Sequence, residues 1–592
     1  MFQVIKNFGA GGLATDPFEE NANAVQWSQM DSVDLVSGDM TSPGQDIVLS
    51  SDCPVTAKWM FAYTADFTDY LFVTDGFEVW STSGGQWSLL VDGWHGGLVT
   101  FTVFLGSLVI NSYTDGPFFW PRQTTLTQDI WGTTSPADLA NPVLNVHWED
   151  QPLTETWNST TFDILLALPG WFAGATCLQI VAYKNFLVAI GVRDPARSQD
   201  IEPYLICWSD AAPAGSLPGE WDPLPTNLAG DTLAQDTPGS LSAAEVMRDD
   251  LNIYKTDGQV YRLTYVGGNL VMNLQRLYHG FGVAYPGAVA SCAGMHYLVT
   301  RSGMMAFDGQ TMHEMDFARI QEDIRAIFQS ANGEISFTCA YPGRKQVWTA
   351  YRQTGEGPYF GILKYDVAQN CFTVHAYSGD NLTAICPGRI GSTFSGPVDT
   401  WIGGDDIPWD AGGSDSWQDG NAQAWDAESL ITWDGDEANG IPNDSTDPWD
   451  KGISTPLQDT MFLAVGDGVI ARYDPRGTPL RYDGTPKTSK ATRYGIRLGD
   501  NTNRQMVRGI YPLAKGPGTL KVTLGKSWSP WQAGGPVAVQ WGPQRTFTPG
   551  VDRFIPLRMV GDSFAIEIAN DDGQEWTLGG IGLEFEPLGK RG

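Results

Sequence analysis

Alternating apolar and polar residues, interrupted by tight turns, recur along most of this chain. The clearest unit runs from Tyr70 to Trp80, where two apolar strands flank Asp75-Gly76. Asp-Gly between alternating apolar residues is the strongest short signal for a β-hairpin, because both residues accept the positive φ of the turn. Six similar units follow, the last two with longer connections: 108–120, 251–263, 296–308, 461–473, 186–208 and 347–365.

Seven such units between about residues 55 and 475 predict antiparallel blades around an axis, a β-propeller. A set of separate β-sandwiches would use the same hairpins. We favour the propeller because each unit is too short to bury its own apolar face. One helix is predicted over 317–328, where apolar residues form a single stripe and Asp316 is a natural N-cap. We expect this helix to pack on the β body.

The alternation resumes after about residue 488 in a block with a different charge. Strand patterns such as Lys521–Leu524 and Ala565–Ile568 predict a β-sandwich of about a hundred residues that folds alone as 485–592. Residues 481–592 hold 15 basic and 10 acidic residues, net +5, so the total of −32 leaves −37 for residues 1–480. The predicted fold is all-β, and its parts are an N-terminal arm with the first strands (1–50), a propeller body (51–400), an acidic insertion (401–454), the last propeller hairpin and hinge (455–484) and the C-terminal β-sandwich (485–592).

The acidic insertion fits neither a strand nor a helix. Between residues 401 and 450 a tryptophan recurs every eight residues, with Ile441 in one slot, among thirteen acidic and no basic residues. This period matches neither the helical repeat nor a short amphipathic strand. The segment is either a solvated loop whose indoles pack on their own domain or an adhesive surface, and we favour the second because exposed tryptophan is costly without a partner. The candidate partner-binding residues are Trp401, Trp409, Trp417, Trp425, Trp433 and Trp449.

Composition narrows the class of protein. A net charge of −32 disfavours a nucleic-acid-binding protein, because contacts to phosphates need positively charged side chains. The seven cysteines are scattered without a CxxC pair, a pattern typical of buried, reduced thiols in a chain that folds in a reducing cytoplasm. The start lacks the features of a signal peptide, and no run of about 20 apolar residues predicts a membrane span.

Catalytic and metal-binding motifs are missing from the sequence. None of the six histidines pairs with another at metal-ligand spacing, and there is no P-loop or GxSxG motif. Asp434-Gly435-Asp436 starts like a calcium loop, but Ala438 and Asn439 stand where a ligand and a glycine should follow. A glycosidase carboxylate pair cannot be chosen among sixty-eight acidic residues. We therefore predict no enzyme activity, no catalytic residue, no metal and no cofactor.

Four stretches, in their order, resemble the tail nozzle proteins (tail tubular protein B, or tail hub) of short-tailed bacteriophages. The first is the glycine-rich 11–16 with 27–33, although Met30 to Val33 stand where the family has Ala-Arg-Asn-Val. The others are Cys207–Asp210 leading to Trp221, the serial Trp-Asp insertion, and the closing segments, which are 547–550, 558–562 and 576–592. Gly561-Asp562 replaces the Gly-Arg that is common in the family.

The resemblance implies a virion structural protein of the viral tail, assembled in the host bacterial cytoplasm. It implies a homo-oligomeric ring, commonly of six copies, that contacts the tail adaptor and tail fibre or tip proteins, and through which double-stranded DNA passes without specific binding. Two alternatives stay open: a carbohydrate-binding or glycosidase-type β-propeller, and a bacterial surface adhesin, which the missing signal peptide disfavours.

Overall fold

The computed structural model describes residues 2–6, 27–120, 165–315, 336–390 and 458–590, apart from short gaps within these ranges, and four short strands between residues 122 and 163. The predicted helix at 317–328 lies outside the described residues. So does the Trp-Asp insertion, with all six candidate tryptophans, and the glycine-rich 11–16.

Seven four-stranded antiparallel sheets make up the main body. The blades, in chain order and from first to fourth strand, are β6–β9 (Trp59–Ala65, Thr68–Thr74, Val79–Thr82, Ser88–Val91), β10–β12 with β17 (Val99–Phe104, Ser107–Ser112, Gly116–Trp120, Leu166–Ala167), β18–β21 (Gln179–Tyr183, Phe186–Ile190, Leu205–Trp208, Gly230–Leu233), β22–β25 (Leu241–Met247, Asp250–Lys255, Gln259–Tyr265, Met272–His279), β26–β29 (Val289–Cys292, Met295–Thr300, Gly303–Phe307, Met312–Glu314), β30–β33 (Ser336–Tyr341, Gln346–Tyr351, Gly361–Asp366, Cys371–Ala376) and β34–β36 with β5 (Ala384–Ile390, Gln458–Val465, Val469–Asp474, Gln45–Ser50).

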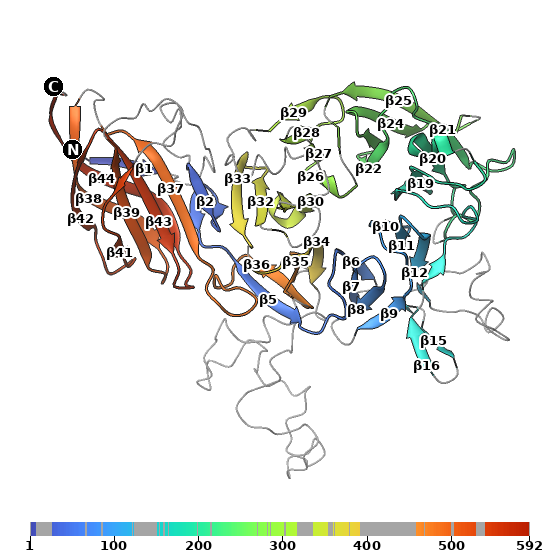
Figure 1. Cartoon of the computed structure of the whole chain (residues 1–592), viewed down its shortest axis with the longest axis horizontal. Helices are drawn as coiled ribbons and strands as arrows, with labels where there is room; N and C mark the ends of the chain where they lie inside the picture. The colour runs from blue at the N-terminus through green and yellow to red at the C-terminus, as the bar shows by residue number, and fades with distance from the viewer. Residues whose placement is uncertain are drawn as a thin grey trace, which may run out of the picture.

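The seven sheets close into a circle. The first strand of every blade contacts the first strand of the next, and β34 of the last blade contacts β6 of the first (Figure 1). The last blade takes its fourth strand, β5, from the N-terminal region, where Val48 pairs with Ala471 of β36. The body is therefore a seven-bladed β-propeller that is closed by strands from both ends of the chain.

Each predicted hairpin is the central strand pair of one blade. Leu108 pairs with Trp120, Leu251 with Leu263 and Met461 with Tyr473, at or near the limits that the sequence pattern indicated. Because successive strands alternate in direction, these turns share one face of the disc. In each blade, the connection between the first and the second strand lies on the opposite face of the disc. One of these connections leaves the last blade at Ile390 and returns at the paired residue Gln458.

The C-terminal block is a β-sandwich, as predicted, with six strands in each sheet. Each sheet includes strands from the first forty-one residues. One sheet has the order β3-β4-β44-β38-β42 with β1 beside β44, and the other has the order β2-β37-β43-β39-β40 with β41 beside β39. The strands are β1 (Phe2–Lys6), β2 (Gln29–Asp31), β3 (Asp34–Val36), β4 (Asp39–Thr41), β37 (Ser489–Ile496), β38 (Asn503–Lys515), β39 (Leu520–Ser527), β40 (Gln540–Trp541), β41 (Arg545–Phe547), β42 (Ile555–Gly561), β43 (Ser563–Asn570) and β44 (Thr577–Lys590).

The described residues among 1–50 are thus shared between the two domains, with β1–β4 in the sandwich and β5 in the propeller. Short elements complete the described chain: β13 (Arg122–Gln123), β14 (Gln151–Pro152), β15 (Thr154–Trp157), β16 (Thr160–Asp163) and the 3-10 turns Gln199–Tyr204, Pro286–Ala288 and Pro342–Arg344. All seven cysteines are free and buried, as the sequence predicted.

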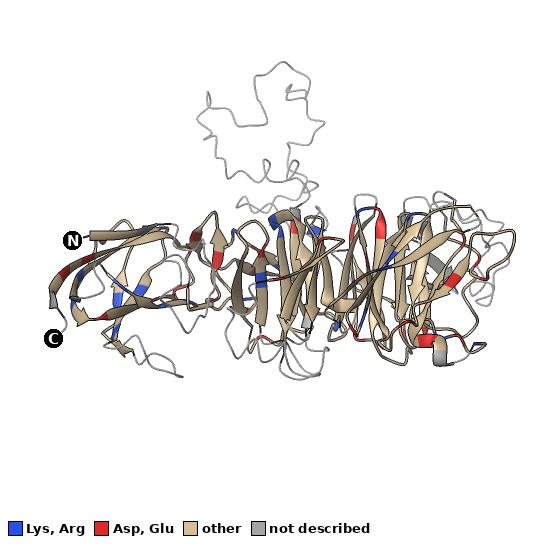
Figure 2. Ribbon diagram, turned by 90° about the horizontal axis from the view of Figure 1, so that it is seen from above, with Lys and Arg blue, Asp and Glu red and all other residues tan. Residues whose placement is uncertain are grey.

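The sandwich lies beside the rim of the propeller and covers neither face of the disc. Figure 1 shows the sandwich next to the blades that contain β32, β33 and β36, and Figure 2 shows the two domains end to end along the longest axis. We call the boundary between them the seam. The position of the sandwich depends on what crosses the seam.

Candidate functional site

Residues 27–50, which we call the strap, cross the seam. Within the strap, β2 pairs with β37 and β4 pairs with β44 in the sandwich, and then β5 pairs with β36 in the propeller. A strand cannot leave its sheet without losing its ladder of hydrogen bonds. The strap therefore holds the two domains together through backbone pairing at both of its ends.

Apolar side chains of the strap fill the space at the seam. Five of them are at most 4% exposed: Trp27, Met30, Val33, Leu35 and Met40. They belong to one continuous cluster of buried residues that includes Ile566 and Leu583 of the sandwich and Leu363 and Phe372 of the propeller. Because the cluster is shared, rotation of one domain against the other would expose apolar surface to water.

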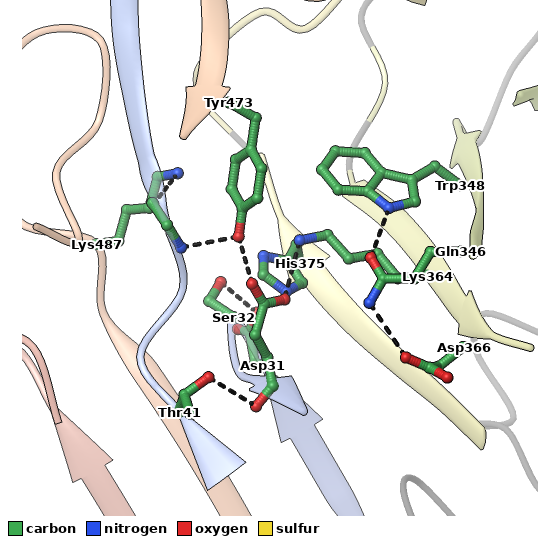
Figure 3. A network of polar contacts seen from close by, with 12 residues as sticks. Asp31, Ser32, Thr41, Gln346, Trp348, Lys364, Asp366, His375, Tyr473 and Lys487 are labelled. Carbon is green, nitrogen blue, oxygen red and sulfur yellow. Dashed lines mark hydrogen bonds and ion pairs between the residues drawn. The ribbon is translucent and has the colours of Figure 1, made fainter. Parts of the chain in front are cut away.

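Asp34 of the strap is the centre of a buried polar network. Its Oδ1 lies 3.0 Å from Lys364 Nζ and 2.9 Å from His375 Nε2, and its Oδ2 accepts a hydrogen bond of 2.5 Å from the Tyr473 hydroxyl (Figure 3). Arg344 Nη1 is 3.8 Å from Oδ2. Lys364 and His375 stand on β32 and β33, and Tyr473 on β36, so one strap carboxylate joins two neighbouring blades.

A second carboxylate of the strap continues the network toward the sandwich. Asp46 Oδ1 is 2.7 Å from Nζ of Lys487, which also donates to the Gly44 carbonyl at 2.8 Å. The Gly44 amide donates to the Tyr473 hydroxyl at 2.8 Å, so Tyr473, which contacts Asp34 directly, is connected to Asp46 through Gly44 and Lys487. Lys487 lies two residues before β37, the first strand of the C-terminal block. We call Asp34, Asp46, Lys364, His375, Tyr473 and Lys487 the seam network.

Burial sets the protonation states of the seam network. Burial raises the pKa of Asp34, but the charge of Lys364 and the proximity of His375 outweigh it and hold this pKa well below its usual value. For Asp46, burial dominates over Lys487 and raises the pKa. Burial lowers the pKa of Lys364 to about 8 and that of His375 to about 4, so His375 is neutral at pH 7. The Asp34–Lys364 ion pair is therefore intact at neutral pH.

Shifted pKa values and clustered charges are also features of active sites, but this network is shielded from substrate. Asp34, Lys364 and His375 are each at most 3% exposed. Replacing a buried ion pair with apolar residues often costs no stability, whereas removing one partner costs a great deal. An arrangement of this kind fixes geometry, because its charges are satisfied in only one relative position of strap and blades.

Structural roles also account for the Trp-Ser-Asp segment at 207–210. Ser209 Oγ accepts a hydrogen bond of 3.0 Å from the Leu187 amide, and Asp210 Oδ1 accepts from the amides of Ala211 and Leu228. Trp221, which follows it, is completely buried. These residues order a loop within one blade.

The described ranges were also searched for metal sites and membrane spans. Among them, no group of three or more His, Cys, Asp or Glu side chains could hold a metal ion. Their helices are too short and polar to cross a membrane. The six candidate tryptophans lie outside the described ranges, so their role in partner binding stays a prediction.

Sequence reasoning missed the seam network. Asp34 and Lys364 are 330 residues apart, and neither stands in a motif or beside a charge pattern that would mark it. The one available signal was the resemblance at 27–33, and it gave no partner for this segment.

Comparison with known proteins gives no family. A scan against protein-family models and a search of the curated proteins each found no match. Solved structures with some likeness include the WD40 repeats of RRP9 (9% identity, TM-score 0.33, covering 60% of this chain and 93% of that chain) and BBS1N from its complex with ARL6DN (12% identity, TM-score 0.32, covering 59% and 91%). At these scores the likeness carries no argument, and the propeller assignment rests on the strand pairing.

Proposed function

We propose that this protein is a structural subunit of a bacteriophage tail, a tail nozzle that assembles into a ring, of six copies by the family resemblance. Its place is the virion tail, after assembly in the host cytoplasm. Its partners are further copies of itself, the tail adaptor and fibre or tip proteins. Double-stranded DNA passes through the ring without specific binding, and the subunit uses no cofactor and catalyses no reaction.

The seam is the observation that carries this proposal. A closed ring needs every subunit to present its two contact surfaces at one fixed angle, since a variable angle gives open chains. Here a paired strap, a shared apolar core and a buried ionic network all fix the sandwich against the propeller.

The charge of the chain agrees with a conduit. Six copies at −32 would carry −192, from six times the charge of one chain. A surface of this sign repels phosphates, so DNA would slide past without pairing to basic side chains. The expected lining of the ring is therefore richer in Asp and Glu than in Lys and Arg.

Particle size tests the proposal. Mass photometry and negative-stain imaging of the purified full-length chain are expected to show an annulus with a central opening, of about 390 kDa for six copies of 64.5 kDa. A particle that stays at 64.5 kDa at every concentration would contradict the ring and favour the carbohydrate-binding or glycosidase alternative. In that case, binding to a polysaccharide array without release of reducing sugar would indicate a carbohydrate-binding protein, and release of reducing sugar would indicate a glycosidase.

The tryptophans of the insertion stay predicted attachment residues for a neighbouring subunit or fibre. Replacing Trp409, Trp417, Trp425 and Trp433 with Ser is expected to leave the propeller folded while weakening attachment, because aromatic side chains supply much of the contact area of an interface. Co-sedimentation of the variant with phage tails that lack the nozzle would measure the loss. Undiminished attachment would remove these residues from the interface.

A further inference from the structure

Three aromatic rings form a row on the outer face of one sheet of the sandwich. Phe2 of β1 meets Tyr511 of β38 edge to face, with ring centroids 5.2 Å apart, and Tyr511 stacks on Phe554, which precedes β42, also at 5.2 Å. Phe2 is 56% exposed and Phe554 is 40% exposed. We call Phe2, Tyr511 and Phe554 the aromatic ridge.

The sheet beneath the ridge is shaped to receive it. Gly582 of β44 pairs with both Val4 and Tyr511, so it lies between the strands that carry the rings. A Cβ added to Gly582 would come within 2.5 Å of the Phe2 ring and 3.2 Å of the Tyr511 Cβ. Only glycine therefore allows the Phe2 ring to lie on the sheet.

The aromatic ridge is not needed for the core of the sandwich. The buried side chains of the same strands, such as Ile510, Ile581 and Leu583, face the second sheet. The ridge is extended on its own side by Val4 and Leu513, which are 40% and 49% exposed. A contiguous exposed apolar surface of this kind is typical of a docking site.

The charges around the ridge indicate an acidic partner. Arg508 is paired with Glu586, the Tyr511 hydroxyl donates to Glu584 at 2.9 Å, and the Asp552 carboxylate accepts a hydrogen bond of 2.8 Å from the Thr548 amide, so these three acidic groups have partners within the sandwich. Arg553 precedes Phe554 and is exposed, as is Arg558 on β42. The whole C-terminal block carries +5.

The same chain supplies an acidic partner. Residues 1–480 carry −37, and they still carry −24 when the thirteen acidic residues of 401–450 are left out. The ridge cannot reach its own propeller, because β1, β42 and β44 lie at the end of the sandwich that points away from it (Figure 1). A second copy presents the same acidic propeller without that restriction.

We propose that the aromatic ridge docks on the propeller of a second copy of this chain, in a head-to-tail contact in which Arg553 and Arg558 face acidic residues of that propeller. The inference rests on the proposed ring and names the surface that builds it. A head-to-tail contact uses two different surfaces of each subunit and closes into a ring when the angle is right. Apolar rings inside a rim of complementary charge are the usual composition of such an interface.

Two matched variants test the surface. The double variant Phe2→Ser/Phe554→Ser is expected to raise the concentration for half-maximal ring assembly about tenfold or more, the size of effect that interface aromatics give. Trp541→Ser is the control, because Trp541 is 38% exposed on β40 of the opposite sheet and should leave assembly unchanged. Thermal melts of both variants are expected to match that of the unaltered chain.

A photo-crosslink identifies the partner. Benzoylphenylalanine in place of Phe554, in a mixture of ¹⁴N- and ¹⁵N-labelled copies, is expected to join the sandwich of one copy to the propeller of another. Cross-links from sandwich to sandwich would overturn the head-to-tail arrangement. Rings that form with normal affinity in the double variant, or an equal loss in Trp541→Ser, would overturn the ridge but leave the nozzle proposal standing. A chain that never assembles would overturn both.

Discussion

Charged side chains are usually exposed and aromatic side chains usually buried. The seam departs from the first rule and the aromatic ridge departs from the second. At the seam, charged groups such as Asp34 and Lys364 are buried, and their partners come from the same chain. At the ridge, Phe2 and Phe554 keep 56% and 40% of their surface in water. The comparison separates an interface that the chain completes by itself from one for which we propose a second molecule.

The largest effect is expected from removing the strap from the sandwich. Residues 485–592 alone should not fold cooperatively, contrary to the expectation from the sequence, because the strap contributes three strands (β2, β3 and β4) and five buried apolar side chains. At about 1.5–3 kcal/mol for each side chain, the loss is comparable with the whole stability of a domain. Near-UV circular dichroism during urea denaturation measures it.

Adding the strap back provides the control for this deletion. A chain that carries residues 27–41 on a flexible linker ahead of 485–592 should regain a single cooperative transition. If 485–592 alone already melts cooperatively at the same urea concentration, the strap is not part of the sandwich core.

The next largest effect is expected for Asp34→Asn. The substitution leaves Lys364 buried near Arg344 without a counter-charge, and loss of one partner of a buried ion pair costs about 3–5 kcal/mol. Arg389→Ala is a suitable comparison, since Arg389 pairs with Asp459 at the surface with 59% of its side chain exposed, and such pairs contribute about 1 kcal/mol or less. Equal effects of the two substitutions in chemical denaturation would refute a special role for the seam.

Acid should loosen the seam before it affects the ridge. His375 has a folded pKa of about 4, below its unfolded value, so its neutral form stabilises the fold above about pH 6.5, and this contribution is lost as the pH falls toward 4. Below that range Asp34, whose folded pKa is lower still than that of a free aspartate, adds to the loss. The variant His375→Gln should show a shallower dependence of the unfolding free energy on pH between 6.5 and 4.5. An unchanged slope would place the proton uptake elsewhere.

The smallest effect on stability is expected for replacing the insertion. Ile390 and Gln458 are paired neighbours in the last blade, so a Gly-Ser linker of about four residues can join them in place of 391–457. We expect the unfolding free energy of the propeller to change by less than about 1 kcal/mol. If the insertion is the attachment surface we propose, binding to the partner should be lost, which separates folding from partner binding. A large fall in stability would mean that the insertion belongs to the core.

The propeller could be predicted because its signals are local. Asp115-Gly116 and Asp257-Gly258 lie within a few residues of the strands they join, and the apolar runs beside them, in β11 and β23, reflect burial on both faces of a blade. The outer strands gave weaker signals. β21 and β25 are half exposed at the rim, so their sequences alternate less clearly.

The seam could not be predicted because its partners are distant in sequence. Nothing around Asp34 indicates that its carboxylate meets Lys364, His375 and Tyr473, and a charged residue in a short strand is usually exposed. The strands that residues 2–41 contribute to the sandwich were not predicted, for the same reason. Charge and turn residues predict a boundary near residue 485, but they carry no information about strands supplied from the other end of the chain.

The hydrogen bond from Tyr473 to Asp34 joins residues that are 439 positions apart in the sequence. It can form only after the ribosome has made both. At about 5–20 residues per second, the ribosome needs roughly 20 to 90 s to add Tyr473 after Asp34 has been made. During that interval β5 is a strand without a neighbour, and the strap has neither of its domains. Closure of the propeller therefore waits until β36 has been made, so a chain truncated before Tyr473 lacks the strand that pairs with β5 and cannot close the ring of blades.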